Sequence, residues 1–203
     1  MTEQLLKIKQ QPFDYQFLKD LFRDYRYPRN KISKLLSSGE IIALKSGLYV
    51  LPERFGRELS LEQAANLLYG PSYISLDYAL SRYGLIPEAV HSVTSVCIGR
   101  KKVFETAIGR FQYNQLKPDY YSLAYQRMNT GSCPYLMATA EKAICDKLYL
   151  AAPLVDARAM ESFLFEDLRL AEGAVRKMDQ NLIVHLAEVS GKHNLKLLKE
   201  IMQ

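Results

Sequence analysis

Apolar residues recur at helical spacing in three short segments near the N-terminus, which predicts three short helices. The second helix is expected to start after Asp14, and the third is expected to start at Pro28 and end at Gly39. The apolar positions of the three segments are Leu5, Leu6 and Ile8; Phe17, Leu18, Leu21 and Phe22; and Ile32, Leu35 and Leu36.

The pattern changes to that of strands between Ile41 and Leu51, where apolar residues flank a Lys45-Ser46-Gly47 turn. This segment predicts a β-hairpin. Three short helices followed by a hairpin is the element order of a winged helix-turn-helix, so we expect that fold at the N-terminus.

A polar connector from Pro52 to Glu58 separates this unit from the rest of the chain. We therefore expect two domains, comprising residues 1–57 and 58–203. Ser60 and Ser75 are predicted to cap the first two helices of the second domain, and Gly84 to end the second of them.

Strand-like runs follow the two helices, and a helical C-terminal end comes last. The simplest interpretation is an antiparallel sheet followed by helices that start after Thr139 and Asp156 and then at Gln180 and Asn194. The predicted fold class is thus α+β. The expected strands are Val93–Ile98, Val103–Ile108, Arg110–Gln115, Tyr121–Gln126 and Tyr135–Ala138.

The positive charge of the chain is concentrated at its N-terminus. The net charge is +5, and residues 1–57 alone carry 11 basic and 6 acidic side chains, while the remainder is close to neutral. A net charge of +5 permits an anionic partner. Because the excess of basic residues lies within residues 1–57, we expect that partner to bind the N-terminal domain.

The three cysteines, Cys97, Cys133 and Cys145, are widely spaced and form no C-x-x-C motif, so neither a disulfide framework nor a zinc cluster is indicated. We expect a cytoplasmic protein. The chain contains neither a signal-peptide pattern nor an apolar run long enough to span a membrane, so we expect no membrane partner.

The third predicted helix has a polar, basic face opposite its apolar one, as a DNA-recognition helix requires. Asn30, Ser33 and Ser37 are the candidates for contacts with base edges. Phosphate contacts are expected from the residues around them: Arg26 and Tyr27 in the preceding turn, Arg29, Lys31 and Lys34 on the helix, and Lys45 at the tip of the wing. An ordinary solvated helix face is the alternative; the element order and the local charge favour binding to double-stranded DNA.

The sequence contains no strong motif of a known type of active site. Asp119, Glu141 and Lys142 superficially suggest a metal-dependent nuclease, but adjacent positions on a helix project about 100° apart. Lys142 and Asp146 instead have the i,i+4 spacing of a structural ion pair. We therefore expect no enzyme, no catalytic or metal-ligating residues and no cofactor.

Three segments of the second domain, together with the predicted winged helix, resemble the AbiEi family of antitoxins from type IV toxin–antitoxin systems, which act in abortive infection. They are YISLDYALSRYGLIPE at residues 73–88, VTSV at 93–96 and ATAEKAICD at 138–146. The resemblance covers nearly the whole chain.

The resemblance implies a bacterial transcriptional repressor that binds inverted repeats upstream of its own operon. It also implies that the C-terminal domain counteracts a nucleotidyltransferase-like toxin without forming a stable complex. The residues that neutralise the toxin are unknown, and the DNA-reading parts would be residues 28–38 and the wing around Lys45. The alternatives are a standalone winged-helix regulator and a protein-interaction module without a cognate toxin.

Overall fold

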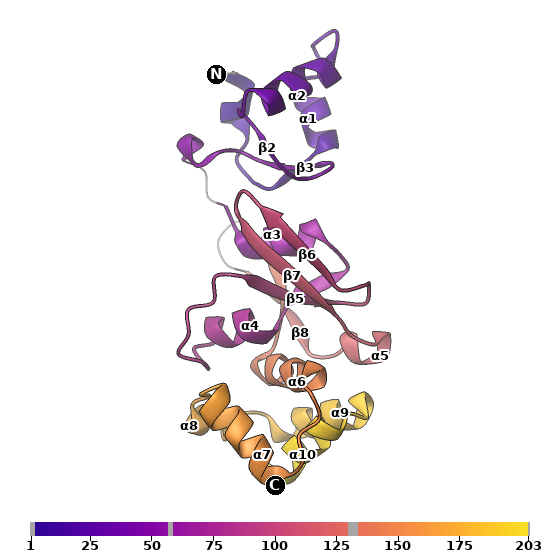
Figure 1. Ribbon diagram of the computed structural model, residues 1–203. Coiled ribbons are helices and arrows are strands. Elements are labelled where there is room, and N and C mark those ends of the chain that lie inside the picture. The colour runs from indigo at the N-terminus through magenta and orange to yellow at the C-terminus, as the bar shows by residue number, and fades with distance from the viewer. Residues whose placement is uncertain (1–2, 57–58, 130–133, 203) are drawn as a thin grey trace.

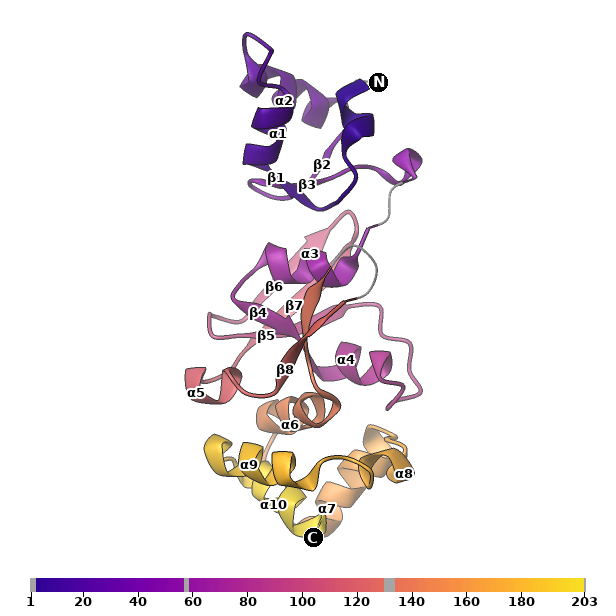
Figure 2. The ribbon, with the colours of Figure 1, turned by 180° about the vertical axis from the view of Figure 1, so that it is seen from behind.

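The computed structural model describes residues 3–56, 59–129 and 134–202. The fold is α+β, as predicted, and its elements stack in three tiers along one axis (Figures 1 and 2). The N-terminal elements form one end, the larger sheet lies in the middle and the last helices form the other end. The expected domain boundary between residues 57 and 58 lies outside the described residues.

The N-terminal tier combines short helices with a three-stranded antiparallel sheet of order β1-β3-β2. The predicted hairpin is confirmed, whereas β1 was not expected and the first predicted helix is a 3-10 helix, η1. The elements are η1 (Glu3–Lys7), β1 (Phe13–Asp14), α1 (Tyr15–Leu21), α2 (Pro28–Ser37), β2 (Ile42–Lys45) and β3 (Leu48–Val50).

Side chains of the hairpin alternate between two hydrophobic cores. Tyr49 and Leu51 join the small core of the N-terminal tier, which also contains Phe22 and Ile32. The neighbouring Leu48 and Val50 join the large core of the central tier, together with Leu44 of β2. The hairpin therefore packs on both sides, and it connects the recognition-helix candidate to the body of the protein.

The central tier contains a six-stranded sheet of order β6-β7-β5-β4-β9-β8. The expectation of an antiparallel sheet is wrong, because β5 pairs with β7 in parallel and β4 pairs with β9 in parallel, so the sheet is mixed. The strands are β4 (Ser72–Ile74), β5 (Val93–Cys97), β6 (Lys102–Thr106), β7 (Gly109–Gln115), β8 (Tyr125–Met128) and β9 (Tyr135–Ala138).

Three helices accompany this sheet: α3 (Leu61–Leu68), α4 (Leu76–Arg82) and α5 (Pro118–Tyr121). The strand expected to begin at Tyr121 begins at Tyr125 instead, because Pro118 starts a helical turn that includes Tyr121. Tyr113 of β7 donates a hydrogen bond from its hydroxyl to the Ala65 carbonyl (2.6 Å), which attaches α3 to one face of the sheet.

The predicted helical C-terminal end is confirmed. Thr139, Asp156 and Asp179 occupy N-cap positions, and each side chain accepts a hydrogen bond from the backbone N–H three residues later. The elements are α6 (Ala140–Leu150), α7 (Ala157–Ser162), a π-helical turn η3 (Phe163–Asp167), α8 (Glu172–Val175), α9 (Gln180–Ser190) and α10 (His193–Met202). In both views α6 lies between the sheet and the remaining C-terminal helices.

Two of the cysteines, Cys97 and Cys145, are buried free thiols, and Cys133 lies outside the described residues. Within the part of the chain that the structure describes, no helix combines the length and the apolar character needed to cross a bilayer.

Candidate nucleic-acid interface

Helix α2 lies at the end of the molecule farthest from the six-stranded sheet (Figure 1). Pro28 takes the first helical position, where its missing N–H costs no hydrogen bond. Ile32 and Leu35 are buried in the small core, and Gly39, at φ +65°, ends the helix in the left-handed conformation that glycine adopts without strain. The apolar face therefore holds α2 against the tier and leaves its opposite face outward.

The three residues expected to contact base edges, Asn30, Ser33 and Ser37, are exposed on α2. The Ser37 hydroxyl donates a hydrogen bond to the Lys34 carbonyl (3.0 Å). Because the hydroxyl proton is used within the helix, Ser37 presents only acceptor lone pairs to a partner. Asn30 retains both the donor and the acceptor of its amide for external contacts.

Four of the cations around this face, on α2 and in the turn before it, have no acidic partner within residues 3–56, 59–129 and 134–202. Among the described residues, no salt bridge involves Arg26, Arg29, Lys31 or Lys34. Arg26 lies over the ring of Tyr27, with its guanidinium carbon 5.3 Å from the ring centroid. Lys31 Nζ lies 5.7 Å from the centroid of the Tyr25 ring. Uncompensated charge at one end of the molecule attracts a polyanion.

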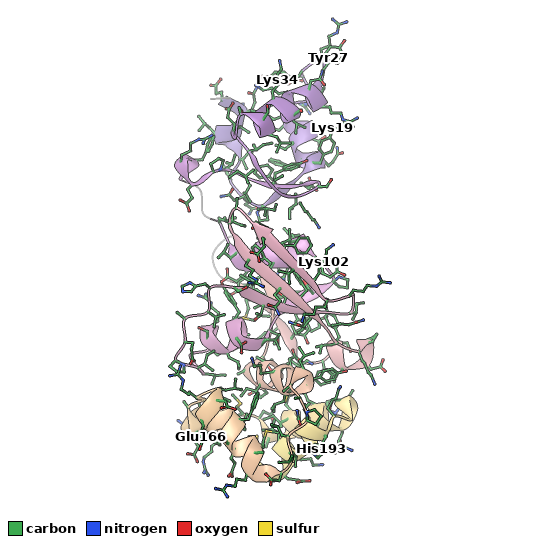
Figure 3. The ribbon with its side chains drawn as sticks, viewed as in Figure 1. Lys19, Tyr27, Lys34, Lys102, Glu166 and His193 are labelled. Carbon is green, nitrogen blue, oxygen red and sulfur yellow. The ribbon has the colours of Figure 1, made fainter. Side chains whose placement is uncertain are left out.

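Tyr27 occupies the N-cap position of α2, but its side chain makes no capping hydrogen bond. Tyr27 is 59% exposed and lies at the turn that precedes the helix (Figure 3). Lys34 projects from this end of the molecule. The first backbone N–H groups of the helix are consequently left without a side-chain cap.

A groove of about 630 Å³ separates α2 from the hairpin turn. Arg29 and Ser33 line one side, and Ser46 and Gly47 of the turn line the other. The turn that follows β2 therefore lies across a groove from the edge of α2 that bears Arg29 and Ser33.

Lys45 does not join this face. Its Nζ donates hydrogen bonds to the carbonyls of Leu67 (3.0 Å) and Leu68 (2.8 Å), the last residues of α3. Its charge lies at the negative end of a helix in the central tier, so the structure does not bring Lys45 together with the other residues expected to contact phosphates. A contact between positions more than 20 residues apart could not be inferred from the turn composition.

Two exposed cations near this face were absent from the sequence-based set. Lys19 lies in the last turn of α1, and Arg23 follows that helix, with its guanidinium Nε 3.8 Å from Asp24 Oδ1. Lys19 is exposed, and the Arg23 side chain is 81% exposed. Their contribution to the N-terminal charge excess was the only signal in the sequence.

In the described part of the chain, no group of three His, Cys, Asp or Glu side chains is close enough together to hold a metal ion. Compared with models of known protein families and with curated protein sequences, the chain matches neither a family nor a protein.

Proposed function

We propose that this chain is a sequence-specific DNA-binding protein of the winged-helix type that inserts α2 into the major groove of an operator. The observation that carries the proposal is the exposed face of α2, where cations that have no acidic partner in the described part of the chain surround short polar side chains. A ten-residue helix is about 15 Å long, and the major groove is about 12 Å wide, so most of α2 can contact bases.

Within that arrangement, base contacts come from Asn30, Ser33 and Ser37. An asparagine amide can bind adenine through paired hydrogen bonds in the major groove. The Ser37 hydroxyl donates its proton within the helix, so its oxygen would accept a hydrogen bond from the amino group of adenine or cytosine. The wing turn Ser46–Gly47 would approach the sugar-phosphate backbone beside the groove.

Phosphate contacts come from Arg26, Arg29, Lys31 and Lys34. Each contact releases about 0.9 of a counterion, so these four cations together would give a salt slope of roughly −3.6. Lys19 and Arg23 are candidates to extend this set. Lys45 is left out of this set because its ammonium donates hydrogen bonds to α3.

The proposed biological role is that of an AbiEi-like antitoxin that represses its own operon and counteracts a nucleotidyltransferase-like toxin without a stable complex. What supports this role is the set of segments that resemble the family: the segment at residues 73–88 contacts both of the others, pairing as a strand with residues 93–96 and bonding to the segment at residues 138–146. Ser75 Oγ donates to Asp146 Oδ2 (2.6 Å), and Lys147, which directly follows the segment at residues 138–146, donates to Asp77 Oδ2 (2.8 Å). The segments at residues 73–88 and 138–146 thus belong to one packed unit.

The DNA proposal is tested by anisotropy titrations of the full chain with DNA from upstream of its gene, at several salt concentrations. Lys34→Ala should weaken binding and reduce the salt slope by about 1. Lys177→Ala removes an exposed lysine from the opposite end of the molecule and is the matched control, expected to bind like the unaltered chain. Unchanged binding by Lys34→Ala would contradict the assignment of this face.

Footprinting separates this proposal from a protein-interaction module, because a winged helix that binds protein would protect no operator. The antitoxin role is tested by coexpression with the product of a neighbouring nucleotidyltransferase-like gene, where restored growth is expected. If no such gene neighbours this one, a standalone regulator is the better description.

A further inference from the structure

A second candidate site lies in the central tier, far along the chain from α2, and its interpretation does not depend on DNA binding. It is a cavity of about 380 Å³ on the face of the sheet where β5 and β7 pair in parallel. The C-terminal end of α6 and the start of η3 form its opposite wall. Cavities of roughly this size and larger hold small-molecule ligands in proteins.

Asn114 of β7 lines the cavity, is only 9% exposed, and has no hydrogen-bond partner for its amide among the described residues. Asn114 is not among the described residues whose polar side-chain atoms are both fully buried and unpartnered, so its amide remains accessible from the cavity and can form hydrogen bonds with a ligand there. Successive side chains of a β-strand point to opposite faces of the sheet. Phe111 and Tyr113 of β7 enter the large core, so the Asn114 side chain lies on the other face.

Gln112 lines the same cavity two residues earlier on β7 and therefore lies on the same face as Asn114. Its amide also has no partner among the described residues. Thr94 lies beside Gln112 on β5, but its hydroxyl is occupied: it donates to the Ser75 carbonyl (2.7 Å) and accepts from the Tyr78 N–H (3.1 Å). Two adjacent carboxamides are thus the groups free to bind a ligand.

The cavity also contains a strained residue, Leu76, whose φ of +61° is unfavourable for a side chain with a Cβ. The surroundings impose this conformation. Ser75 gives its hydroxyl to Asp146 instead of capping α4, and Thr94 supplies the cap from the neighbouring strand. Strained backbone of this kind clusters at binding sites.

The remaining walls are apolar or electrically neutral. Leu150, Ala151 and Phe163 form the side opposite the amides. Asp77 and Lys147 lie at the cavity, but their mutual ion pair (2.7 Å) compensates both charges. A ligand here meets carboxamides on one side, an aromatic ring and aliphatic groups on the other, and no unpaired charge.

We propose that this cavity binds a purine nucleoside, with its base hydrogen-bonded to the amides of Asn114 and Gln112 and flanked by Phe163. A carboxamide matches the neighbouring donor and acceptor of adenine through two parallel hydrogen bonds. Aromatic and aliphatic side chains accept the flat faces of a base. The neutral Asp77–Lys147 pair favours an uncharged nucleoside over a nucleotide.

The test is calorimetric titration of the full chain with adenosine, supported by saturation-transfer NMR. Unaltered protein should bind adenosine, and Asn114→Leu should bind it at least about tenfold more weakly because the paired hydrogen bonds are lost. Gln112→Leu should also weaken binding. Asn181→Leu, which replaces an exposed amide on α9 outside the cavity, is the matched control and should bind normally.

A melting experiment distinguishes lost binding from lost folding. Without ligand, Asn114→Leu should melt at about the same temperature as the unaltered chain, because the amide that it removes makes no hydrogen bond among the described residues. Adenosine 5′-monophosphate should bind no more tightly than adenosine. The proposal is overturned if the unaltered chain does not bind adenosine at millimolar concentration, if Asn114→Leu binds it equally well, or if the monophosphate binds more tightly.

Discussion

Lys142 and Asp146 form an ion pair with an Nζ–Oδ1 distance of 2.7 Å, and both side chains are fully buried. Lys142 Nζ also donates to the Tyr120 carbonyl (3.0 Å) and lies over the Tyr120 ring. Asp146 Oδ2 accepts hydrogen bonds from Ser75 Oγ (2.6 Å) and the Tyr73 hydroxyl (3.2 Å). The pair thus connects α6 to β4, α5 and the start of α4 through one buried polar network.

Burial raises the pKa of the Asp146 carboxyl and lowers the pKa of the Lys142 ammonium, because desolvation disfavours both charged forms. Removing one partner leaves the other charge buried without compensation. Lys142→Met should therefore lower the free energy of unfolding by about 3–5 kcal/mol, measured by urea denaturation at pH 8. The double variant Lys142→Met/Asp146→Asn should lose less free energy of unfolding than Lys142→Met alone. An equal or larger loss would contradict the energetic coupling of Lys142 and Asp146.

The loss caused by Lys142→Met should shrink in acid. Without Lys142, the Asp146 pKa in the folded state rises further above its unfolded value, since the lysine opposes the rise. The folded state then binds a proton that the unfolded state has released, so the contribution of Asp146 is favourable at low pH and is lost as the pH rises through the folded pKa. Urea denaturation of both proteins from pH 4 to pH 8 measures the difference, which should widen steadily with pH.

Because several tyrosines are buried, we expect the stability of the fold to decrease steeply in alkali. Burial raises the pKa of several phenols above the ordinary value of 10, and that of Tyr121 to about 12. The group comprises Tyr73, Tyr78, Tyr83, Tyr113, Tyr120 and Tyr121. Between pH 10 and 12 the folded state retains phenolic protons that the unfolded state releases, so the stability present below pH 10 falls as the pH rises.

The measurement is tyrosinate absorbance recorded together with circular dichroism during an alkaline titration. Ionisation of the buried group should coincide with unfolding. Tyr121→Phe should make the fall in stability less steep. Gradual ionisation of all tyrosines near pH 10, with the fold intact, would contradict the burial of these phenols.

The cap of α4 gives a further prediction. Thr94 Oγ1 accepts from the Tyr78 N–H and donates to the Ser75 carbonyl, so it replaces the capping role expected of Ser75. Thr94→Val preserves the shape but leaves both backbone groups without this partner. Unfolding free energy should fall by about 1–2 kcal/mol in urea denaturation. Ser92→Val, at a half-buried position just before β5, is the comparison: its hydroxyl makes only one long hydrogen bond, to the Arg110 carbonyl (3.4 Å), so it should lose less stability than Thr94→Val.

Helix starts were predictable from the sequence because their signals are local. Asp14, Ser60, Thr139 and Asp156 each accept a backbone hydrogen bond from three residues further along. Ser75 has the same local signal, but its hydroxyl binds Asp146, 71 positions away. Neighbouring residues in the sequence thus predict where a helix begins, whereas the hydrogen-bond partner of a side chain such as Ser75 depends on the tertiary structure.

Strand pairing and burial were less predictable for the same reason. The parallel partners of β4 and β5 come from distant segments, and the i,i+4 pair of Lys142 and Asp146, expected from its spacing, has the pattern of an exposed pair. At the candidate interface, periodicity correctly predicted which side of α2 is exposed. The position of Lys45 depended instead on how the hairpin packs against α3.

Lys45 and Lys34 should therefore respond to substitution in opposite ways. Lys45→Met removes two hydrogen bonds to the C-terminal carbonyls of α3 and the favourable charge at that helix end, so thermal denaturation should show a loss of about 1 kcal/mol. Because its ammonium contacts α3, the salt slope of DNA binding should stay unchanged. Lys34→Met should show the reverse, with unchanged stability and a slope reduced by about 1. If Lys45→Met also reduced the slope, the ammonium would leave α3 to contact DNA, and the hairpin would belong to the DNA-binding surface after all.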